Sequence, residues 1–595
     1  MNIRNGVVAV GHVIAIRDSK VTLELAPADP RPRVTYGSYL AIHAGTRVLV
    51  AVVTALTLGG TLGARTVLAD LDLLGEIVEE EGRSFARGVT IYPVIGDAAL
   101  LLPACDLQLI YRVSAARTAA VGSHAQDPSL PACIKADDLL AKHFAVLGAT
   151  GVGKSSAVAV ILDAVLGARP DVRAFLLDVH NEYAACFGPR ANVVSPRTLK
   201  LPFWLFNIEE VTDVIYGGRP PVDEEIEILA ELVPAAKAKY AQYKEAGERQ
   251  LIKRSAARTS GFTADTPVPY LLQDLVALID ERMGRLENRN SRLHHHRLIT
   301  RIETIRSDPR YAFMFDNANV GGDVMGDLLA HLFRLQPDGR PITIMQLAGL
   351  PAEVLDAVVC VLCRLAFEFG IWSDGAVPLL FVCEEAHRYA SADRSVGFSP
   401  TRRALSRIAR EGRKHGVHLG LVTQRPAELD PTIISQCSTV FAMRMTNDRD
   451  QAYLAAAVSD TANLLSFVPH LGTGECIAFG EGVPIPARVR FSRLAAEALP
   501  RSDTSGSGLD TTGAEPSAAF VGTVVERWRV ATMNKGRTEP DPVAALGARE
   551  PVPEGGAGAA LDQAHRRLLR RPLDAADSAP AQESRSAGSG LWQSR

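Results

Sequence analysis

The segment Gly148-Ala149-Thr150-Gly151-Val152-Gly153-Lys154-Ser155 has the spacing G-x-x-x-x-G-K-S. In a glycine-rich loop of this kind the backbone N–H groups point at phosphate oxygens, and the N-terminus of the next helix adds a favourable dipole. An apolar run at 143–147 enters the segment and a helical pattern leaves it, which is the context the motif requires. We expect it to bind a nucleoside triphosphate, with Lys154 on the β- and γ-phosphates and the Ser155 hydroxyl on Mg²⁺. The expected nucleotide contacts are Gly148, Thr150, Gly151, Val152, Gly153, Lys154, Ser155 and Ser156.

Two carboxylates, Glu384 and Glu385, follow an apolar strand predicted at 379–383. Beside a P-loop, the first acid can organise Mg²⁺ through its water shell and the second can polarise the attacking water. An apolar strand ending in acids is also an ordinary strand end, but its pairing with the P-loop favours hydrolysis. We therefore place Glu384 with Ser155 at the metal, and Glu385 at the lytic water.

Polar residues also end two other predicted strands: Asp178 follows 172–177 and Gln424 follows 417–423. In open α/β folds, ligands bind outside the carboxyl ends of the strands. Gln424 could hydrogen-bond the γ-phosphate or the lytic water. Each of these residues taken alone could equally be structural, but together with Glu384 and Glu385 they predict one hydrolytic site.

Three arginines, Arg407, Arg410 and Arg413, recur at every third position and so lie near one helix face. The face could simply be solvated. Alternatively, one of these arginines contacts phosphate in its own subunit or in a neighbouring one, as an arginine finger.

The elements that must position these residues follow from hydrophobic periodicity. Short β-branched runs near the N-terminus predict a small barrel, and strands alternating with helices predict an α/β core with a parallel sheet. A stretch at 116–140 resembles a linker, and residues beyond about 495 have the composition of a mostly disordered tail with helical islands at 521–528 and 561–571. The expected domains are a barrel at 1–115, the first part of the core with the P-loop at 116–207, a helical insertion at 208–335, the second part of the core at 336–494 and the tail at 495–595.

The bulk composition is that of a globular protein. With 595 residues, several domains are expected, and a net charge of −3 gives no global basic field. No apolar stretch reaches 18 residues, so we expect a cytoplasmic protein with no membrane partner. Cys360 and Cys363 have metal-like spacing but lack a second pair, and we interpret them as core cysteines.

Taken together, these motifs resemble the HerA family of hexameric DNA-translocating ATPases and helicases, within the FtsK/HerA group of P-loop NTPases. The resemblance covers roughly residues 1–535. It is carried by K-H-F-A-V-L-G-A-T-G-V-G-K-S at 142–155, D-V-H-N-E-Y at 178–183, E-E-A-H at 384–387, R-E-G-R-K-H-G at 410–416, T-Q-R-P at 423–426, R-G-V-T-I-Y-P-V-I-G-D at 87–97 and G-E-C-I-A-F-G at 474–480.

The resemblance implies a RecA-like core and a homohexameric ring with double-stranded DNA in its channel, bound without sequence preference. It also implies ATP and Mg²⁺ as cofactors, Glu385 as the catalytic glutamate, Gln424 as the sensor and Arg410 as a phosphate-contacting arginine. This chain departs from the family pattern at two positions. Lys142 stands where the family often has Arg. A contact from this position to a neighbouring subunit would therefore be made by a point charge, without the paired hydrogen bonds of a planar guanidinium group. Asn181 stands where Gly is usual, and Asn tolerates the left-handed geometry.

For DNA contact we expect a loop after Glu385 that carries Arg388, Arg394, Arg402 and Arg403. Such a loop could follow phosphates without reading bases, or it could be an ordinary surface loop. A basic stretch at 282–306 with three adjacent histidines is more typical of a solvated helix, and adjacent histidines on a helix diverge too much to bind one metal.

Three functions remain open from the sequence. The first is an ATP-driven translocase or helicase with a NurA-like nuclease partner in DNA end resection, or with a sirtuin-like or nuclease effector in anti-phage defence. The second is an ATP-binding ring scaffold that assembles effector subunits on its barrel, with motor activity secondary. The third, a conjugation-type pump, is disfavoured because no membrane segment is seen.

Overall fold

The computed structural model describes residues 9–17, 20–26, 34–59, 66–78, 83–111, 117–125, 127–196, 198–217, 219–248, 261–285, 289–316, 322–348, 350, 352–393, 399–457, 465–501 and 525. The chain divides into two units, Met1–Lys535 and Gly536–Arg595. All described residues belong to the first. Of the two helical islands predicted in the tail, Val525 alone is described, in helical conformation, and 561–571 lies outside the described residues.

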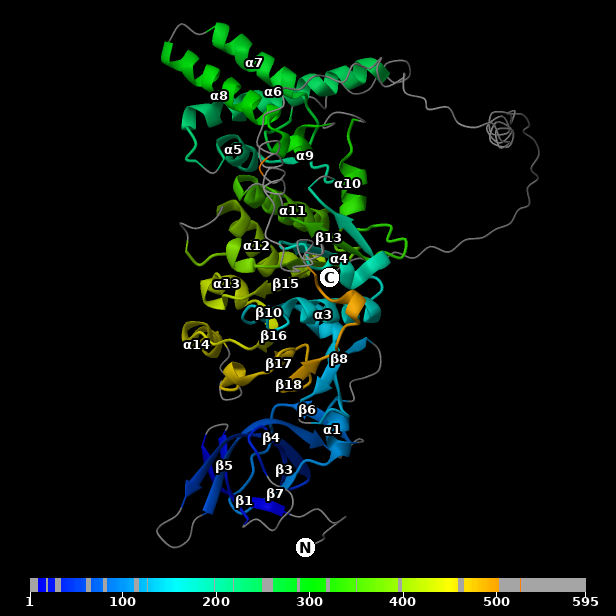
Figure 1. Cartoon of the computed structure of the whole chain (residues 1–595), viewed down its shortest axis with the longest axis vertical. Coiled ribbons are helices and arrows are strands. Elements are labelled where there is room, and N and C mark those ends of the chain that lie inside the picture. Colours follow the sequence, from blue (N-terminus) through cyan, green and yellow to red (C-terminus); the bar gives the residue numbers. More distant parts are fainter. Residues whose placement is uncertain are drawn as a thin grey trace, which may run out of the picture. The chain divides into compact units, whose positions relative to one another are not determined.

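The N-terminal part is a small β-barrel. In the described ranges its strands follow the order β2-β1-β7-β3-β4-β5-β6, and β5 pairs back onto β2, so six strands close and β6 stays outside (Figure 1). The alternation of buried and exposed residues along these strands places Val13, Leu23 and Leu71 in the barrel core. The elements are β1 Ala9–Arg17, β2 Lys20–Leu25, β3 Tyr39–Ala44, β4 Arg47–Gly59, β5 Thr66–Val78, β6 Ser84–Arg87, β7 Ala98–Leu101 and a short helix, α1 Ala104–Tyr111.

The core is a second sheet, of order β12-β13-β11-β14-β15-β10-β16-β17-β18-β8-β9 in the described residues. From β12 to β16 neighbouring strands are parallel, whereas β17, β18, β8 and β9 are antiparallel to their neighbours. The predicted parallel sheet is therefore confirmed from β12 to β16, and β17, β18, β8 and β9 extend it as an antiparallel part that the sequence did not predict. The strands are β8 Thr118–His124, β9 Pro131–Lys135, β10 His143–Leu147, β11 Arg173–Asp178, β12 Ala191–Val194, β13 Ile342–Gln346, β14 Leu379–Cys383, β15 Val417–Thr423, β16 Cys437–Met443, β17 Glu475–Gly480 and β18 Ala487–Phe491.

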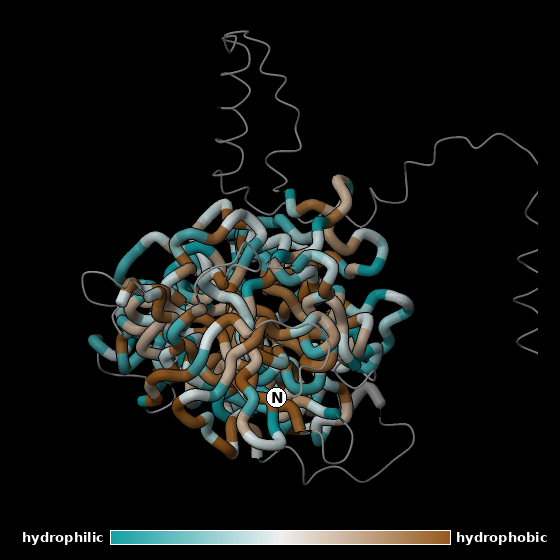
Figure 2. Tube along the Cα trace, turned by 90° about the horizontal axis from the view of Figure 1, so that it is seen from below, coloured by the Kyte–Doolittle hydropathy of each residue, from teal (hydrophilic) through white to brown (hydrophobic). Residues whose placement is uncertain are grey.

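Both faces of this sheet are buried. Along β11, Phe175 and Leu177 pack into one hydrophobic cluster, and Ala174 and Leu176 pack into another on the opposite face. Helices cover both faces, so the parallel strands read as continuous apolar runs. In the trace in Figure 2 the hydrophobic segments run through the interior. The helices of the core are α2 Ala136–Ala141, α3 Lys154–Ala168, α4 Ala184–Phe187, α11 Ala352–Trp372, α12 Ser399–Glu411, α13 Pro431–Ile434 and α14 Asp448–Ala457.

A helical insertion separates β12 from β13, as predicted from the helical periodicity (green in Figure 1). It begins at a capping box, in which the Asn207 side chain accepts from the Glu210 N–H and Glu210 accepts from the Asn207 N–H. His294, His295 and His296 differ in exposure, as expected for three neighbours on one helix. The helices are α5 Ile208–Tyr216, α6 Asp223–Glu248, α7 Leu272–Gly284, α8 Arg289–Ser307, α9 Ala312–Phe315 and α10 Met325–Leu332.

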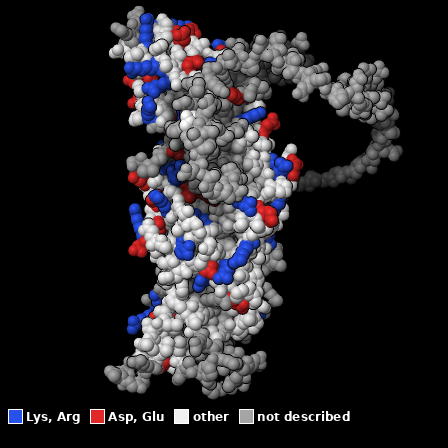
Figure 3. Space-filling model, in the orientation of Figure 1, with Lys and Arg blue, Asp and Glu red and all other residues white. Residues whose placement is uncertain are grey.

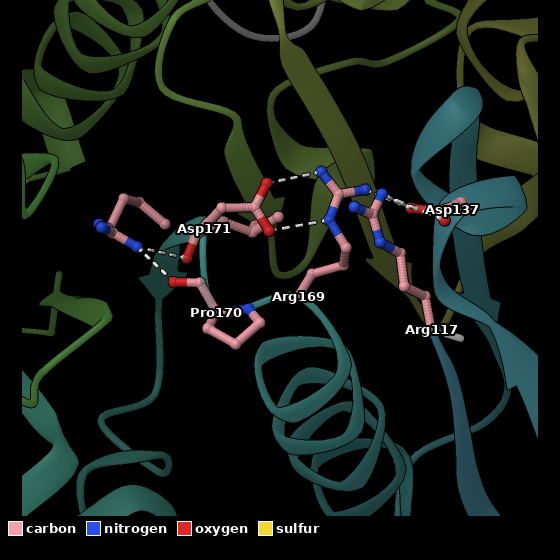
Figure 4. Close-up of polar contacts among 7 residues, drawn as sticks. Arg117, Asp137, Arg169, Pro170 and Asp171 are labelled. Atoms are coloured by element: carbon pink, nitrogen blue, oxygen red, sulfur yellow. Dashed lines mark hydrogen bonds and ion pairs between the residues drawn. The ribbon is translucent and has the colours of Figure 1, made fainter. Parts of the chain in front are cut away.

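The prediction of a linker at 116–140 is wrong. Strands β8 and β9 and helix α2 fill this stretch and extend the core sheet beyond β18. Charged residues tie it to the core: Asp137 accepts from both Arg117 and Arg169, and Arg169 forks onto Asp171 (Figure 4). This network lies near the amino end of β11, at the sheet edge opposite the P-loop.

Charges of both signs are interspersed on the face shown in Figure 3, in keeping with the small net charge. Cys360 and Cys363 are buried in α11, as expected of core cysteines. Among the described residues, no helix is both long and apolar enough to span a bilayer.

Candidate nucleotide site

The P-loop connects β10 to α3 through backbone that only glycine adopts readily. Gly151 and Gly153 have φ of 76° and 94°, in the left-handed region. A Cβ on Gly148 would lie 2.8 Å from the Met443 Cβ, so this position must stay small where the loop passes β16. Ser155 and Ser156 fall in the first turn of α3, where unpaired N–H groups face the loop.

The polar side chains of the P-loop are engaged with nearby protein groups. The Lys154 ammonium donates to the Ala149 carbonyl at 2.9 Å, and the Ser155 hydroxyl donates to Glu182 Oε2 at 2.8 Å. The Thr150 hydroxyl donates to Gln424 Oε1. Lys154 and Thr150 must exchange these protein partners when a nucleotide binds, whereas Ser155 can keep its donated proton on Glu182 and still offer its oxygen to a metal.

Four adjacent strands deliver the predicted residues to one sheet edge. These strands lie in the order β11-β14-β15-β10. Strand β11 ends at Asp178, β14 is followed by Glu384, β15 is followed by Gln424, and β10 is followed by the P-loop. Their pairing is parallel and in register, with Leu177 beside Cys383 and Thr423 beside Leu147. The structure therefore brings Asp178, Glu384, Glu385 and Gln424 to the same edge as Lys154 and Ser155.

Asp178 supports a turn instead of reaching outward. It is fully buried, and its two oxygens accept from the Glu182 and Tyr183 N–H groups, each at 3.0 Å. Burial raises the pKa of its carboxyl, and these backbone hydrogen bonds partly offset the rise. The turn contains Asn181 at φ 55°, so this Asn adopts the left-handed conformation that Asn tolerates.

Glu384 and Glu385 differ in environment. Glu384 is 4% exposed and accepts from the Tyr183 hydroxyl at 3.1 Å, while its Oε2 has no hydrogen-bond partner among the described residues. Burial, reinforced by Asp178 and Glu182, holds the pKa of Glu384 well above its usual value.

Glu385 has left-handed backbone, with φ 49°, which is strained for a residue with a side chain. Its Oε1 lies 3.7 Å from His180 Nε2 and its Oε2 lies 3.2 Å from His387 Nδ1. The second contact lacks hydrogen-bond geometry, and His387 Nδ1 also contacts the Thr423 hydroxyl at 3.0 Å. Burial lowers the pKa of His387.

The donor set fits a magnesium nucleotide. Burial lowers the pKa of Lys154, and the negative charges of Glu385, Glu384 and Glu182 partly restore it. One hydroxyl, one ammonium and several carboxylates around a glycine loop are the groups that a P-loop uses to hold Mg²⁺ and phosphates. The Glu384 Oε2 atom, which has no hydrogen-bond partner among the described residues, is suited to a cation or its bound water at this edge.

Lys142 is not brought to the P-loop of its own chain. It precedes β10 at the opposite end of the strand, where its ammonium pairs with Glu481 Oε1 at 2.5 Å. Arg410 is exposed in α12, on the side of the sheet away from the nucleotide edge. Contact of either residue with a neighbouring subunit stays a prediction.

The expected DNA-contacting loop is partly helix. Arg402 and Arg403 lie in α12, which begins at Ser399. Arg403 donates to Glu209 Oε2 at 2.5 Å, and that pair joins α12 to α5. Arg388 is exposed in the turn after Glu385, and Arg394 lies outside the described residues.

Two further site residues were missed from the sequence. Glu182 contacts Ser155, and Tyr183 contacts Glu384. Both belong to the D-V-H-N-E-Y segment, whose first acid alone was selected. The spacing of a carboxylate four residues after the strand end was the available signal.

A family model and several curated relatives are similar to the central part of the chain. The family model described as "Helicase HerA, central domain" matches residues 119–366. The DNA double-strand break repair helicase HerA of Pyrococcus furiosus is 27% identical over 407 residues, covering 62% of this chain and 69% of the relative. A probable helicase of Methanocaldococcus jannaschii is 26% identical over 452 residues, covering 72% and 79%.

More distant likenesses appear among solved structures. A bacterial conjugative coupling protein, TrwB, is 16% identical with a TM-score of 0.42, covering 67% of this chain and 94% of that one. VirB4 of Thermoanaerobacter pseudethanolicus is 14% identical with a TM-score of 0.44, covering 65% and 99%. The P-loop, the acid-ended strand beside it and the sequence matches agree: residues 119–366 match the central domain of the HerA helicases, and the chain is similar to HerA helicases over most of its length.

Proposed function

We propose that the chain is the motor subunit of an ATP-driven double-stranded DNA translocase or helicase that works as a homohexameric ring. The observation that carries this proposal is the convergence of Lys154, Ser155, Glu384, Glu385 and Gln424 at one sheet edge. These are groups that P-loop enzymes use for phosphoryl transfer to water. The relatives named as DNA-repair helicases supply the DNA substrate class.

Each residue has a distinct task in this mechanism. Lys154 would leave the Ala149 carbonyl to hold the β- and γ-phosphates, and the Ser155 hydroxyl oxygen would be a ligand of Mg²⁺. Mg²⁺, when bound, neutralises charge on the phosphate oxygens. Glu385 orients the lytic water and accepts its proton. Gln424 leaves Thr150 to follow the γ-phosphate, so that hydrolysis changes its hydrogen bonding.

Movement of Gln424 has a direct route to the segment after Glu385. The Asp430 N–H donates to the Ala390 carbonyl at 2.8 Å, and the Ala392 N–H donates to the Glu428 carbonyl at 2.8 Å. These bonds fasten the stretch that follows Gln424 to the stretch that carries Arg388. A shift at Gln424 would therefore reach the proposed DNA-contacting segment.

The catalytic proposal is tested with Glu385→Gln, which keeps side-chain volume but cannot accept a proton. We expect ATP binding to persist, while ATP hydrolysis falls by about 10²–10⁴-fold and strand displacement and translocation on duplex DNA disappear. Glu303→Gln, in helix α8, is the matched control. If Glu385→Gln abolishes hydrolysis yet leaves DNA processing and activation of a partner intact, the motor proposal is wrong.

The DNA proposal is tested by salt titration of duplex binding. Replacing Arg388 and Arg402 with Ala should lower the slope of log affinity against log salt by roughly two, about one per lost phosphate contact. Arg403→Ala should have a smaller effect because Glu209 already holds Arg403. An unchanged slope in the Arg388/Arg402 variant would remove these residues from the DNA site.

A partner nuclease or effector has a candidate docking surface on the barrel. Four large apolar side chains of the loop between β6 and β7 are 44–70% exposed: Ile91, Tyr92, Val94 and Ile95. Exposed apolar groups gathered in one loop favour a protein contact. This observation also supports the second candidate, a ring scaffold whose ATP turnover is regulatory.

Replacing Tyr92 and Ile95 with Ser tests this docking surface. The partner should dissociate while the basal ATPase rate is kept. If the partner stays bound, the loop between β6 and β7 is not its docking surface.

A further inference from the structure

Glu182 holds the hydroxyl group expected to bind Mg²⁺. Its Oε2 accepts from Ser155 Oγ at 2.8 Å, across 27 residues of sequence. A serine that donates its proton to a carboxylate keeps both oxygen lone pairs for a cation. The contact therefore orients the Ser155 oxygen as a metal ligand instead of competing for it.

The chain fixes the Glu182 backbone from three sides. Its N–H donates to Asp178 Oδ1 at 3.0 Å, and its carbonyl accepts from the Arg501 N–H at 3.1 Å. The left-handed Asn181 directs the chain back toward the P-loop just before it. Asp178, fully buried with both oxygens used by backbone, thus supports the turn that delivers Glu182.

Several carboxyl groups surround Lys154 at this edge of the sheet. Glu182, Glu384 and Glu385 all act on the single ammonium of Lys154. Glu384 is only 4% exposed, and its Oε2 has no hydrogen-bond partner among the described residues. A buried carboxylate oxygen without a donor is costly unless a cation or its bound water completes it.

We propose that Glu182 is a positioning residue for Mg²⁺: it orients the Ser155 hydroxyl and adds negative charge beside the metal in the magnesium-nucleotide complex. The inference rests on the proposed nucleotide site and adds to it a residue outside the P-loop and the acid-ended strand β14. Glu182 touches neither phosphate nor lytic water; it acts through Ser155.

The experiment measures metal binding directly. Mn²⁺ replaces Mg²⁺ as the probe, and its affinity for the protein–ADP complex is read by electron paramagnetic resonance. Glu182→Gln keeps the shape and an accepting oxygen but removes the charge, and we expect Mn²⁺ to bind about 10-fold more weakly. ADP affinity in the presence of EDTA should not fall, and Glu303→Gln should match the unmodified protein in both measurements.

A double-mutant cycle separates positioning from general destabilisation. If Glu182 acts through the hydroxyl, Glu182→Gln should add little to the loss caused by Ser155→Ala. The ATPase rate of Glu182→Gln should also recover as Mg²⁺ is raised, which a damaged fold would not allow.

The outcomes distinguish this inference from the proposed function. Unchanged Mn²⁺ affinity in Glu182→Gln, with weakened affinity in Ser155→Ala, overturns the role of Glu182 and leaves the nucleotide site standing. Additive losses in the double variant also overturn it, because Glu182 would then act independently of Ser155. If the unmodified protein binds no Mn²⁺ in the ADP complex, the nucleotide site itself is wrong.

Discussion

Two residues with side chains, Asn181 and Glu385, hold left-handed backbone at the nucleotide site, with φ of 55° and 49°. Such backbone costs about 1–2 kcal/mol for an ordinary residue. Asn tolerates it well, whereas Glu does not. Strain retained at the carboxylate beside the lytic water indicates that surrounding contacts determine its position.

The turn at Asn181 gives a prediction at the scale of one residue. Asn181→Gly should keep the ATPase rate, because Gly adopts the same backbone without cost. Asn181→Val should lower stability by about 1–2 kcal/mol and weaken the Mn²⁺ affinity of the ADP complex, because a β-branched residue resists this φ. Thermal unfolding and the metal titration measure both. Equal behaviour of the two variants would show that the turn does not depend on left-handed geometry.

The sensor residue gives a second prediction. Gln424→Ala removes the acceptor of the Thr150 hydroxyl and the amide proposed to face the γ-phosphate. ATP binding should persist while hydrolysis falls by about 10²–10³-fold, the usual cost of one missing transition-state donor. Nucleotide affinity and single-turnover rates give the two quantities separately. A rate within twofold of the unmodified protein would leave Gln424 a structural partner of the P-loop.

At the scale of elements, the sequence was sufficient to predict a strand and its site residue where a motif directly follows an apolar strand. The strands before Asp178, Glu384 and Gln424 are largely apolar runs. Both the strands and the polar residues that follow them were therefore predictable. Pairing between distant strands was not, because β8 and β9 are short and mixed in composition and gain their place from contacts with β18. The partners of Ser155 and Arg403 depend on the same long-range folding and were missed for that reason.

The start of the helical insertion depends on a buried ion pair. Arg364 in α11 donates to Glu210 Oε1 at 2.9 Å and to Oε2 at 2.8 Å, and Glu210 is fully buried at the start of α5. Arg364→Met should lower stability by about 3–5 kcal/mol because the Glu210 charge stays buried without its partner. Adding Glu210→Gln should recover much of the loss. Denaturant unfolding followed by circular dichroism measures both, and a neutral effect of Arg364→Met would contradict the role of the pair.

Strand β8 carries a prediction about pH. His124 is 5% exposed and packs against Tyr111 with its ring tilted, the ring centroids 3.9 Å apart, and burial lowers the pKa of His124 to about 4. Below its unfolded pKa of about 6.5 the unfolded chain gains a proton that the folded chain does not, so stability falls as pH drops from about 6.5 to 4. His124→Phe should reduce this dependence by up to about 1.4 kcal/mol per pH unit. Thermal unfolding at pH 7.5, 6 and 5 tests it; parallel curves for the two proteins would contradict it.

At the scale of the whole molecule, Arg410, the arginine proposed to contact phosphate, does not lie at the nucleotide edge of its own chain. Among the described residues of the site, Lys154 is the cation that faces the carboxylates, while Arg410 lies exposed in α12 and Lys142 pairs with Glu481. Developing charge on a transferring phosphoryl group is commonly met by an arginine from a neighbouring subunit. A ring in which α12 of one copy faces the P-loop of the next would supply it.

This arrangement predicts complementation between two inactive variants. Glu385→Gln lacks the proton acceptor and Arg410→Ala lacks the proposed arginine, so each alone should hydrolyse ATP slowly. In mixed rings a site built from the Glu385 of one variant and the Arg410 of the other is complete. Random mixing at equal amounts should therefore restore about a quarter of the sites, since each head-to-tail interface takes the right pair in the right order by chance.

The double variant mixed with Glu385→Gln serves as the control and should stay inactive, because no interface then combines both intact residues. If the mixture of single variants also stays inactive although mass photometry shows that mixed rings form, Arg410 acts within its own subunit or not at all.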